Sequence, residues 1–243
     1  MDREVQLAEA FVALADPLAD DVDPVTLLDR LAHHCVEIIG ADAVGIMMAT
    51  SRSTLRTMVV TDGRAGLVEL FQTQSDEGPC LDCFRTNEPV NAPDLRASTD
   101  RWPRLAPFAV HHGYRAAHAL PFRVKHQTIG SVNLLLADPG GLSDTDLRLA
   151  QALTDVAALA LVHWNPDPLR RNDIATRAQS ALACKATIEM ATGMLAEFGG
   201  LSTAEAYSVL RTHTARNGDR LISTARALVR RTLSPDALLA EHR

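Results

Sequence analysis

The pattern of apolar and polar positions divides the chain at about residue 165. Before that point, helical periodicity over residues 3–19 and 25–39 gives way to apolar runs over 44–49, 55–60, 116–125 and 128–137, which predict strands. A helical pattern returns at residues 143–162. After residue 165 every periodic segment is helical, over residues 169–198, 202–217, 219–232 and a short stretch from Ser234. This order predicts an α+β domain, with an antiparallel sheet of consecutive hairpins flanked by helices, followed by an all-α domain.

Polar residues between these segments indicate where helices begin. Asp23 and Ser143 are expected N-caps, Ser202 and Glu205 have capping-box spacing, and Asp219 is expected to cap the third helix of the second part. Two prolines, at positions 166 and 168, cannot both lie inside a helix without cost. We therefore expect a domain over residues 1–164, a linker over 165–172 and a helical domain over 173–238.

The composition is that of a folded protein with a substantial core. The chain has 243 residues, of which 47% are hydrophobic and 22% charged. Neither a secretory signal nor an apolar run long enough for a membrane helix is present in the sequence, so we expect a cytoplasmic protein. Four cysteines are few for this length, and in a reducing compartment we expect free thiols.

The charge is unevenly distributed. Residues 1–165 carry 13 basic and 22 acidic side chains, a net charge of −9, and residues 166–243 carry 11 basic and 8 acidic ones, a net charge of +3. Together they give the net charge of −6. A change of sign between the two parts indicates that the basic part meets an anionic partner.

Candidate chemistry in the first part centres on Cys80 and Cys83. Their C-x-x-C spacing is compatible with a redox pair or half of a metal site, but a zinc site needs four ligands and no second C-x-x-C exists. The alternative is a lid residue and a small buried hydrophobe, and we assign no metal ligands. Asp76 and Glu77 form either a general acid–base pair or, as we expect, the cap of a helix begun by Pro79.

Residues 74–137 resemble the GAF domains of actinobacterial regulators. The resemblance is carried by a series of short motifs: Glu77-Gly78-Pro79-Cys80-Leu81-Asp82, Glu88-Pro89-Val90, Asp94-Leu95, Arg101-Trp102-Pro103, Gly113-Tyr114-Arg115, Ala119-Leu120-Pro121-Phe122 and Ile129-Gly130-Ser131-Val132-Asn133-Leu134. It implies an antiparallel sheet of about six strands, with a small-molecule pocket under residues 74–115. On this basis Cys80, Cys83, Trp102 and Tyr114 are the candidate ligand-pocket or redox residues, although Trp102 can equally pack the lid. The resemblance does not identify the ligand or any cofactor.

Residues 182–229 resemble an ANTAR domain, a three-helix unit. The residues that carry the resemblance are Leu182, Lys185, Ile188-Glu189-Met190-Ala191-Thr192-Gly193-Met194-Leu195, Gly199, Ser202, Ala206-Tyr207, Leu210-Arg211, Ala215, Asn217, Leu221 and Ala225. The resemblance implies binding of paired RNA stem-loops, transcription antitermination and a homodimer. Family members usually carry Arg where Lys185 stands and Lys where Thr192 stands, so the second departure removes a charge.

The residues themselves support part of this interpretation. Positions Ile174, Ala178, Ala181, Lys185, Ile188, Thr192 and Leu195 form a heptad pattern. This face can pair with a partner helix, or the other side, with Leu182, Ala186, Met190 and Met194, can pack in the bundle. The candidate RNA-binding residues are Lys185 and Thr192, which share a helix face, and four arginines able to contact phosphates: Arg211, Arg216, Arg220 and Arg226.

The sequence thus predicts a non-enzymatic regulator that binds RNA under the control of a ligand or the redox state of the GAF domain. We weigh two alternatives. One is a thiol enzyme that, like some GAF proteins, reduces free methionine sulfoxide. The other is a protein-interaction module that has lost RNA binding.

Overall fold

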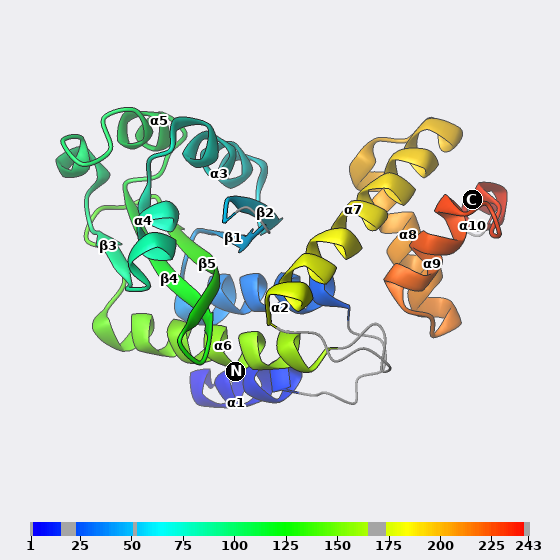
Figure 1. Ribbon diagram of the computed structural model, residues 1–243, viewed down its shortest axis with the longest axis horizontal. Coiled ribbons are helices and arrows are strands. Elements are labelled where there is room, and N and C mark those ends of the chain that lie inside the picture. Colours follow the sequence, from blue (N-terminus) through cyan, green and yellow to red (C-terminus); the bar gives the residue numbers. More distant parts are fainter. Residues whose placement is uncertain (1, 16–22, 51–52, 165–173, 241–243) are drawn as a thin grey trace. The chain divides into compact units, whose positions relative to one another are not determined.

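The computed structural model describes residues 2–15, 23–50, 53–164 and 174–240 (Figure 1). The chain folds into two compact units: residues 1–17 with 26–179, which we call the sheet unit, and residues 18–25 with 180–243, which we call the helical unit. The two prolines of the expected linker lie outside the described residues. No helix in the described ranges is long and apolar enough to cross a membrane.

The sheet unit is built on an antiparallel sheet of five described strands. These are β1 (Ala43–Ala49), β2 (Leu55–Val60), β3 (Val90–Ala92), β4 (Ala116–Val124) and β5 (Gln127–Leu136), in the order β2-β1-β5-β4-β3. Both predicted hairpins are confirmed, since β1 pairs with β2 and β4 with β5. The second turn consists of Lys125 and His126, because Val124 pairs with Gln127, and Lys125 takes a left-handed φ of 57° there.

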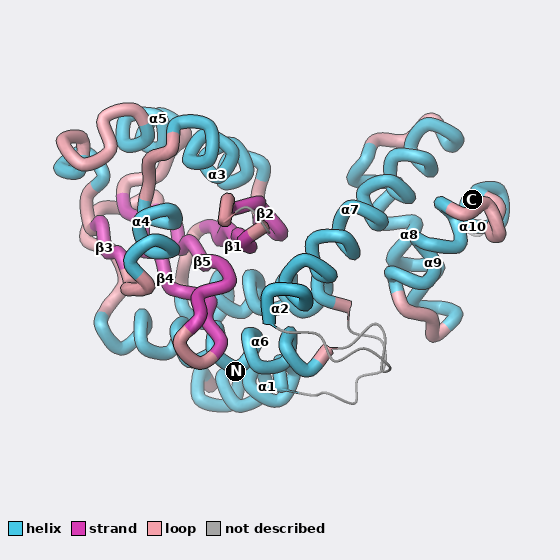
Figure 2. Tube along the Cα trace, in the orientation of Figure 1, coloured by secondary structure: helices cyan, strands magenta, loops and turns pink. Residues whose placement is uncertain are grey.

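Helices cover both faces of this sheet. They are α1 (Arg3–Ala15), α2 (Pro24–His34), α3 (Gly63–Ser75), α4 (Pro79–Thr86), α5 (Leu105–His111) and α6 (Asp144–His163). Figure 2 shows α3, α4 and α5 on one side of the strands and α2 and α6 on the other, with α1 packed on α6. Since both faces are covered, β1, β4 and β5 are buried along almost their whole length.

The predicted caps of two of these helices are confirmed. The Asp23 carboxylate accepts a hydrogen bond of 2.9 Å from the Val25 backbone N–H at the start of α2. The Ser143 hydroxyl accepts one of 3.1 Å from the Asp146 N–H at the start of α6. A π-helical turn (Cys35–Ile39) follows α2, and a 3-10 turn (Leu95–Ser98) lies between β3 and α5.

The helical unit contains α7 (Ile174–Gly199) from residue 180 onward, α8 (Thr203–Asn217), α9 (Leu221–Val229) and α10 (Pro235–Ala240). The predicted capping box of α8 is confirmed: Ser202 Oγ accepts from the Glu205 N–H, and Glu205 Oε2 accepts from the Ser202 N–H. The expected cap of α9 by Asp219 is wrong. The N-cap position is Arg220, whose side chain makes no capping hydrogen bond, so Asp219 lies one residue too early.

The heptad face of α7 packs inside the helical unit. Ile188, Thr192 and Leu195 are all buried. On the other side of the helix, Ala186 is exposed and Met190 keeps 53% of its surface exposed. The alternative in which that other side packs in the bundle is therefore wrong. Because Ile188 and Leu195 are strongly apolar, their burial outweighs the weaker Ala and Thr positions between them.

Candidate functional sites

A carboxyl group is buried where α3 packs on the sheet. Glu69 is fully buried, and its Oε1 accepts a hydrogen bond of 2.8 Å from Asn133 Nδ2 on β5. Gly45 on β1 leaves the necessary space, because a Cβ there would lie 2.4 Å from Glu69 Oε1. Burial raises the pKa of Glu69 to about 7, and the Asn133 hydrogen bond opposes this shift. The carboxyl group therefore changes protonation near neutral pH.

Three neighbours complete a buried polar cluster around this carboxyl group: Gln72, Ser131 and Asn133. In the described part of the chain, Glu69 Oε2, Gln72 Nε2, Ser131 Oγ and Asn133 Oδ1 are buried and have no hydrogen-bond partner. A buried polar atom without a partner costs about 1–3 kcal/mol. Two acceptor atoms, an amide donor and a hydroxyl of this cluster thus have unused hydrogen-bonding capacity. This cluster is the candidate sensing site of the sheet unit.

Cys80 and Cys83 lie one turn apart on α4, and both are free, buried thiols. Cys80 adjoins the polar cluster, since its N–H donates to Gln72 Oε1 at 3.1 Å. Burial, and then the charge of Glu69, raise the pKa of Cys80 well above its ordinary value, while burial raises the pKa of Cys83 to about 12. Because the thiolate is the nucleophile and the metal ligand, neither residue is activated. Among the described residues, no group of three His, Cys, Asp or Glu side chains is placed to hold a metal ion.

Trp102 and Tyr114 are buried in the core that lies under α3, α4 and α5. Trp102 Nε1 donates to Asp82 Oδ2 at 3.1 Å, and the Tyr114 hydroxyl donates to both carboxylate oxygens of Asp62 at 3.0 Å. Asp62 also caps α3. Burial, followed by the Asp62 hydrogen bond, raises the pKa of Tyr114. Trp102 and Tyr114 thus fix the positions of helices. Of the four predicted pocket residues, only Cys80 has a described hydrogen bond to a member of the polar cluster.

The expected cap of α4 by Asp76 or Glu77 is wrong. The N-cap of α4 is Gly78, which has no side chain to make such a bond. Glu77 instead caps α5, since its Oε2 accepts from the N–H groups of Arg104 and Leu105 at 2.8 and 3.1 Å. The Arg104 side chain pairs with Glu77 at 2.7 Å and holds the pKa of that carboxyl below its ordinary value. The free amides of α5 and a nearby cation attract the carboxylate more than α4 does.

The cluster members Glu69, Gln72 and Ser131 were not predicted as site residues. The sequence nevertheless contains a weak indication of the two helical members, Glu69 and Gln72. Ala65, Val68, Glu69 and Gln72 have the spacing of one helix face, so two polar side chains occupy a face that is otherwise apolar. Which strand residue faces them depends on how the helix lies on the sheet, and the spacing does not determine that.

The predicted RNA-binding residues of the helical unit differ in accessibility. Thr192 is 8% exposed, and its hydroxyl donates to the Ile188 carbonyl at 2.8 Å within α7. The Lys185 side chain is 25% exposed and pairs with Glu189 at 3.2 Å. The four arginines predicted from the sequence are all exposed: Arg211, Arg216, Arg220 and Arg226. The surface available to a partner is therefore made by arginines of α8 and α9 rather than by Thr192.

Several arginines of the helical unit, including two beyond the predicted set, form no ion pair that the described residues show. Arg211 lies over the Tyr207 ring at 5.9 Å, and Arg226, Arg230 and Arg231 are exposed. Among the described residues none of these four makes an ion pair with a carboxylate. Arg226 and Arg230 are four residues apart and share one face of the helix end. Such a surface suits phosphate groups, which pair readily with guanidinium.

Comparison with known proteins identifies two domain families along the chain. A GAF domain model matches residues 21–162, and an ANTAR domain model matches residues 176–229. A comparison with functionally curated proteins found no significant match.

Among solved structures, the chain is similar to the GAF domain of an Acinetobacter phosphoenolpyruvate-protein phosphotransferase, with 14% identity over 69% of this chain and 100% of that one and a TM-score of 0.51. It is also similar to a structure described as that of the GAF domain, with 15% identity over 66% and 89% of the two chains and a TM-score of 0.50. A free methionine-R-sulfoxide reductase from Neisseria meningitidis is 17% identical over 66% and 90%, with a TM-score of 0.49. The fold and the two domain matches agree with the motifs of the sequence: the chain belongs to the GAF family and joins a GAF domain to an ANTAR domain, the architecture of signal-sensing, RNA-binding regulators.

Proposed function

We propose that this protein is a transcription antiterminator that binds paired RNA stem-loops through its helical unit, as a homodimer, under the control of a small molecule bound in the sheet unit. The single observation that supports RNA binding best is a set of exposed arginines in the helical unit that pair with no carboxylate in the described part of the chain: Arg211, Arg226, Arg230 and Arg231. Arginines that served only fold stability would be expected to pair with neighbouring carboxylates. A dimer matches a target with two stem-loops, each contacted by one helical unit.

Control by the sheet unit is supported by the polar cluster around Glu69. Its buried groups without partners gain hydrogen bonds when a polar molecule enters, so ligand binding and the packing of α3 are energetically linked. Cys80 touches this cluster through Gln72. We infer that the signal is a small polar ligand rather than a thiol oxidation.

The two alternatives receive less support. A sulfoxide reductase needs an accessible thiolate, and Cys80 and Cys83 are buried thiols with raised pKa values. A protein-interaction module that has lost RNA binding would have its basic charge buried or paired with acids. Arg226, Arg230 and Arg231 are exposed, and no carboxylate of the described ranges pairs with them. We therefore propose a regulator without catalytic residues.

The test is binding of the purified full-length protein to an RNA that carries two adjacent stem-loops. An RNA with one of the two loops replaced by a nicked duplex, and a DNA duplex of equal length, serve as controls. We expect at least tenfold tighter binding to the two-loop RNA, and read-through of a terminator that overlaps the second loop in a purified transcription reaction. Equal affinity for all three nucleic acids would contradict loop recognition, and binding without read-through would contradict antitermination.

A further inference from the structure

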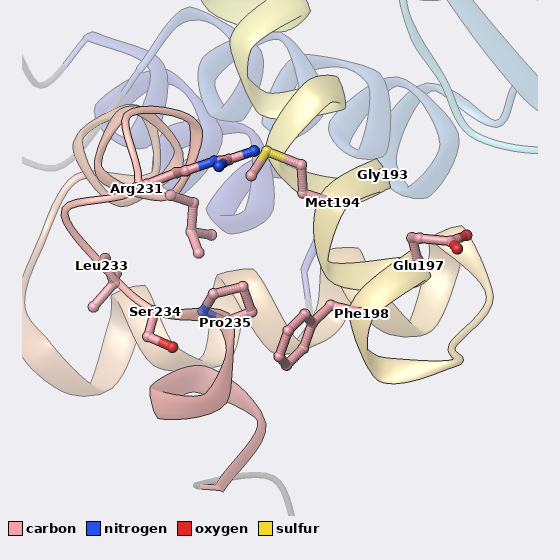
Figure 3. Close-up of a pocket in the computed structure, with 9 residues that line it drawn as sticks. Gly193, Met194, Glu197, Phe198, Arg231, Leu233, Ser234 and Pro235 are labelled. Carbon is pink, nitrogen blue, oxygen red and sulfur yellow. The ribbon is translucent and has the colours of Figure 1, made fainter.

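A groove of about 660 Å³ lies on the helical unit, between the last turns of α7 and the segment that joins α9 to α10 (Figure 3). Its wall is mostly apolar and includes Met194, Phe198, Leu228, Leu233 and Pro235. Phe198 keeps 57% of its surface exposed, and its ring lies opposite Pro235 in Figure 3. Small-molecule pockets usually measure about 300–1,000 Å³, so a group the size of a nucleotide fits.

Gly193 also lines this groove, in the interior of α7. Glycine in a helix interior is less stable than alanine because it loses more backbone freedom on folding. A Cβ added at Gly193 would meet no atom within 4 Å, so no contact in the described structure requires glycine here. The missing side chain leaves a place where a bound group can approach the helix backbone closely.

Arg231 stands at the opposite wall in an unusual backbone conformation. Its φ is 59°, the left-handed conformation that follows many helix ends and is usually taken by glycine or asparagine. Its N–H donates to the Leu228 carbonyl at 2.9 Å, which closes the end of α9. Figure 3 shows the Arg231 side chain reaching toward Met194, whereas the Glu197 carboxylate runs away from the groove. The groove therefore has a cation at its edge that no described carboxylate neutralises.

Gly193 and Arg231 are each less favourable for local stability than a common alternative, which is alanine at position 193 and glycine at position 231. They meet at one groove that also exposes an aromatic ring. Positions that break a local rule are expected where function requires them. Arg231 and Pro235 lie beyond residue 229, where the ANTAR match ends, so the groove is not a feature of the matched segment alone.

We propose that this groove receives one unstacked base from an RNA loop, with the base against Phe198 and its phosphate on Arg231. The proposal rests on the RNA-binding function proposed above. The charge favours RNA as the occupant, since the exposed cation Arg231 lines the groove and its neighbour in the sequence, Arg230, is also exposed. Loops of RNA present unstacked bases, and aromatic side chains stack on them regardless of base identity.

The experiment uses the full-length protein and an RNA selected by it from two-stem-loop RNAs with randomised loops. Each loop nucleotide of that RNA is replaced in turn by an abasic one. We expect a loss of affinity of about tenfold or more at one position in each loop, the size of one base–aromatic stack. The variant Phe198→Leu should bind the unmodified RNA about tenfold more weakly and lose the abasic effect at that position.

Two further variants separate binding from folding. Gly193→Ala and Arg231→Gly should leave the thermal unfolding midpoint unchanged or higher, because each replaces the locally less stable residue. Both should weaken RNA binding about tenfold, Gly193→Ala through the methyl group placed in the groove. Met190→Ala removes an exposed side chain of α7 that does not line the groove, and Arg230→Ala removes a neighbouring charge; both should keep the full abasic effect.

The proposal is overturned if Phe198→Leu, Gly193→Ala and Arg231→Gly bind the selected RNA as the unaltered protein does. It is also overturned if these variants bind weakly but keep the abasic effect at the same position. A protein that selects no RNA from the pool contradicts the proposed function itself. Selective RNA binding that ignores the groove variants contradicts only the base-binding groove.

Discussion

All the arginines with a described ion pair lie in the sheet unit, although exposed arginines such as Arg56 and Arg96 there have none. In the sheet unit, Arg85, Arg101 and Arg115 each pair with a carboxylate, on Asp76, Asp82 and Asp94 respectively. In the helical unit, four exposed arginines on α8, on α9 and just after α9 have no described ion pair. Paired arginines tie loops to helices within the fold, whereas unpaired ones are available to an external anion. Arginine therefore has a structural role in the sheet unit, and we propose that it has a binding role in the helical unit.

The two units also differ in whether their candidate polar groups are buried or exposed. The sheet unit buries Glu69, Gln72, Ser131 and Asn133 together, while the polar contact surface of the helical unit is exposed. A buried cluster responds to a molecule that enters the core and changes packing. An exposed surface responds to a macromolecule without any rearrangement of the core. This division suits a sensor in the first unit and an output in the second.

The largest effect is expected for thiol reactivity. An exposed, reactive cysteine in the sheet unit would contradict its description as a sensor with buried polar groups. Cys83, with a pKa of about 12, carries roughly three-thousandfold less thiolate at neutral pH than a free cysteine of pKa about 8.5. We expect Cys80 and Cys83 to resist iodoacetamide in the native protein and to react in 6 M guanidinium, as followed by mass spectrometry of the labelled peptides. Rapid native labelling of either residue would restore the thiol-enzyme alternative.

The next effect is a pH dependence of stability from Glu69. Its pKa rises from 4.5 in the unfolded chain to about 7 in the folded one, so between these values the folded state holds a proton that the unfolded state has released. The contribution of Glu69 to the free energy of unfolding is fully present below pH 4.5. It falls by about 3 kcal/mol as the pH rises to about 7. Glu69→Gln should remove this slope. Tryptophan fluorescence during urea unfolding measures it in the sheet unit, where Trp102 and Trp164 both lie. Equal slopes in the two proteins would contradict the buried carboxyl.

Gly45 provides a smaller test of the same cluster. A methyl group there would lie 2.4 Å from Glu69 Oε1 and 2.8 Å from its Cγ, and the buried side chain has little room to move. We expect Gly45→Ala to lower the free energy of unfolding by about 1–3 kcal/mol. Gly63→Ala, where a Cβ would meet nothing within 4 Å, is the matched control and should change it little. A neutral Gly45→Ala would mean that Glu69 packs elsewhere.

The smallest expected effect concerns the helical unit, whose fold should tolerate surface changes. Ser202→Ala removes the capping box of α8 and should cost about 1 kcal/mol. Ser208→Ala, an exposed change inside the same helix, should stay within about 0.5 kcal/mol of the unaltered protein. Hydrogen exchange of the α8 amides measures both. An equal response to the two changes would show that the capping box does not hold the start of the helix.

Much of the fold followed from periodicity and capping, because these depend on residues close in sequence. The two hairpins, α6 and the Ser202 capping box are of this kind. Features that depend on distant segments were missed or wrong. Glu77 was expected to cap the adjacent α4 and instead caps α5, 27 residues further along the chain. Likewise Glu69 joins a site only because α3 lies across β1 and β5, which no local pattern specifies.

The helical unit shows the same limit. The charge of the segment predicted an anionic partner, and the arginines are indeed exposed, but the pattern did not show that Thr192 is buried. Nor did it reveal the groove, since Phe198, Arg231 and Pro235 belong to three different segments. Residue types that bear charge are readable from sequence, whereas their juxtaposition requires the tertiary structure.

The central claim, that the unpaired arginines bind RNA, is tested most directly by the salt dependence of affinity for the two-stem-loop RNA. Each lost phosphate contact should reduce the slope of log K against log salt concentration by about 0.7–0.9. We predict that Arg211→Ala and Arg226→Ala each lower this slope, whereas Arg85→Ala, which removes a paired arginine of the sheet unit, leaves it unchanged. A slope that is insensitive to both helical-unit changes, or that falls equally with Arg85→Ala, would contradict the assignment of RNA binding to this surface.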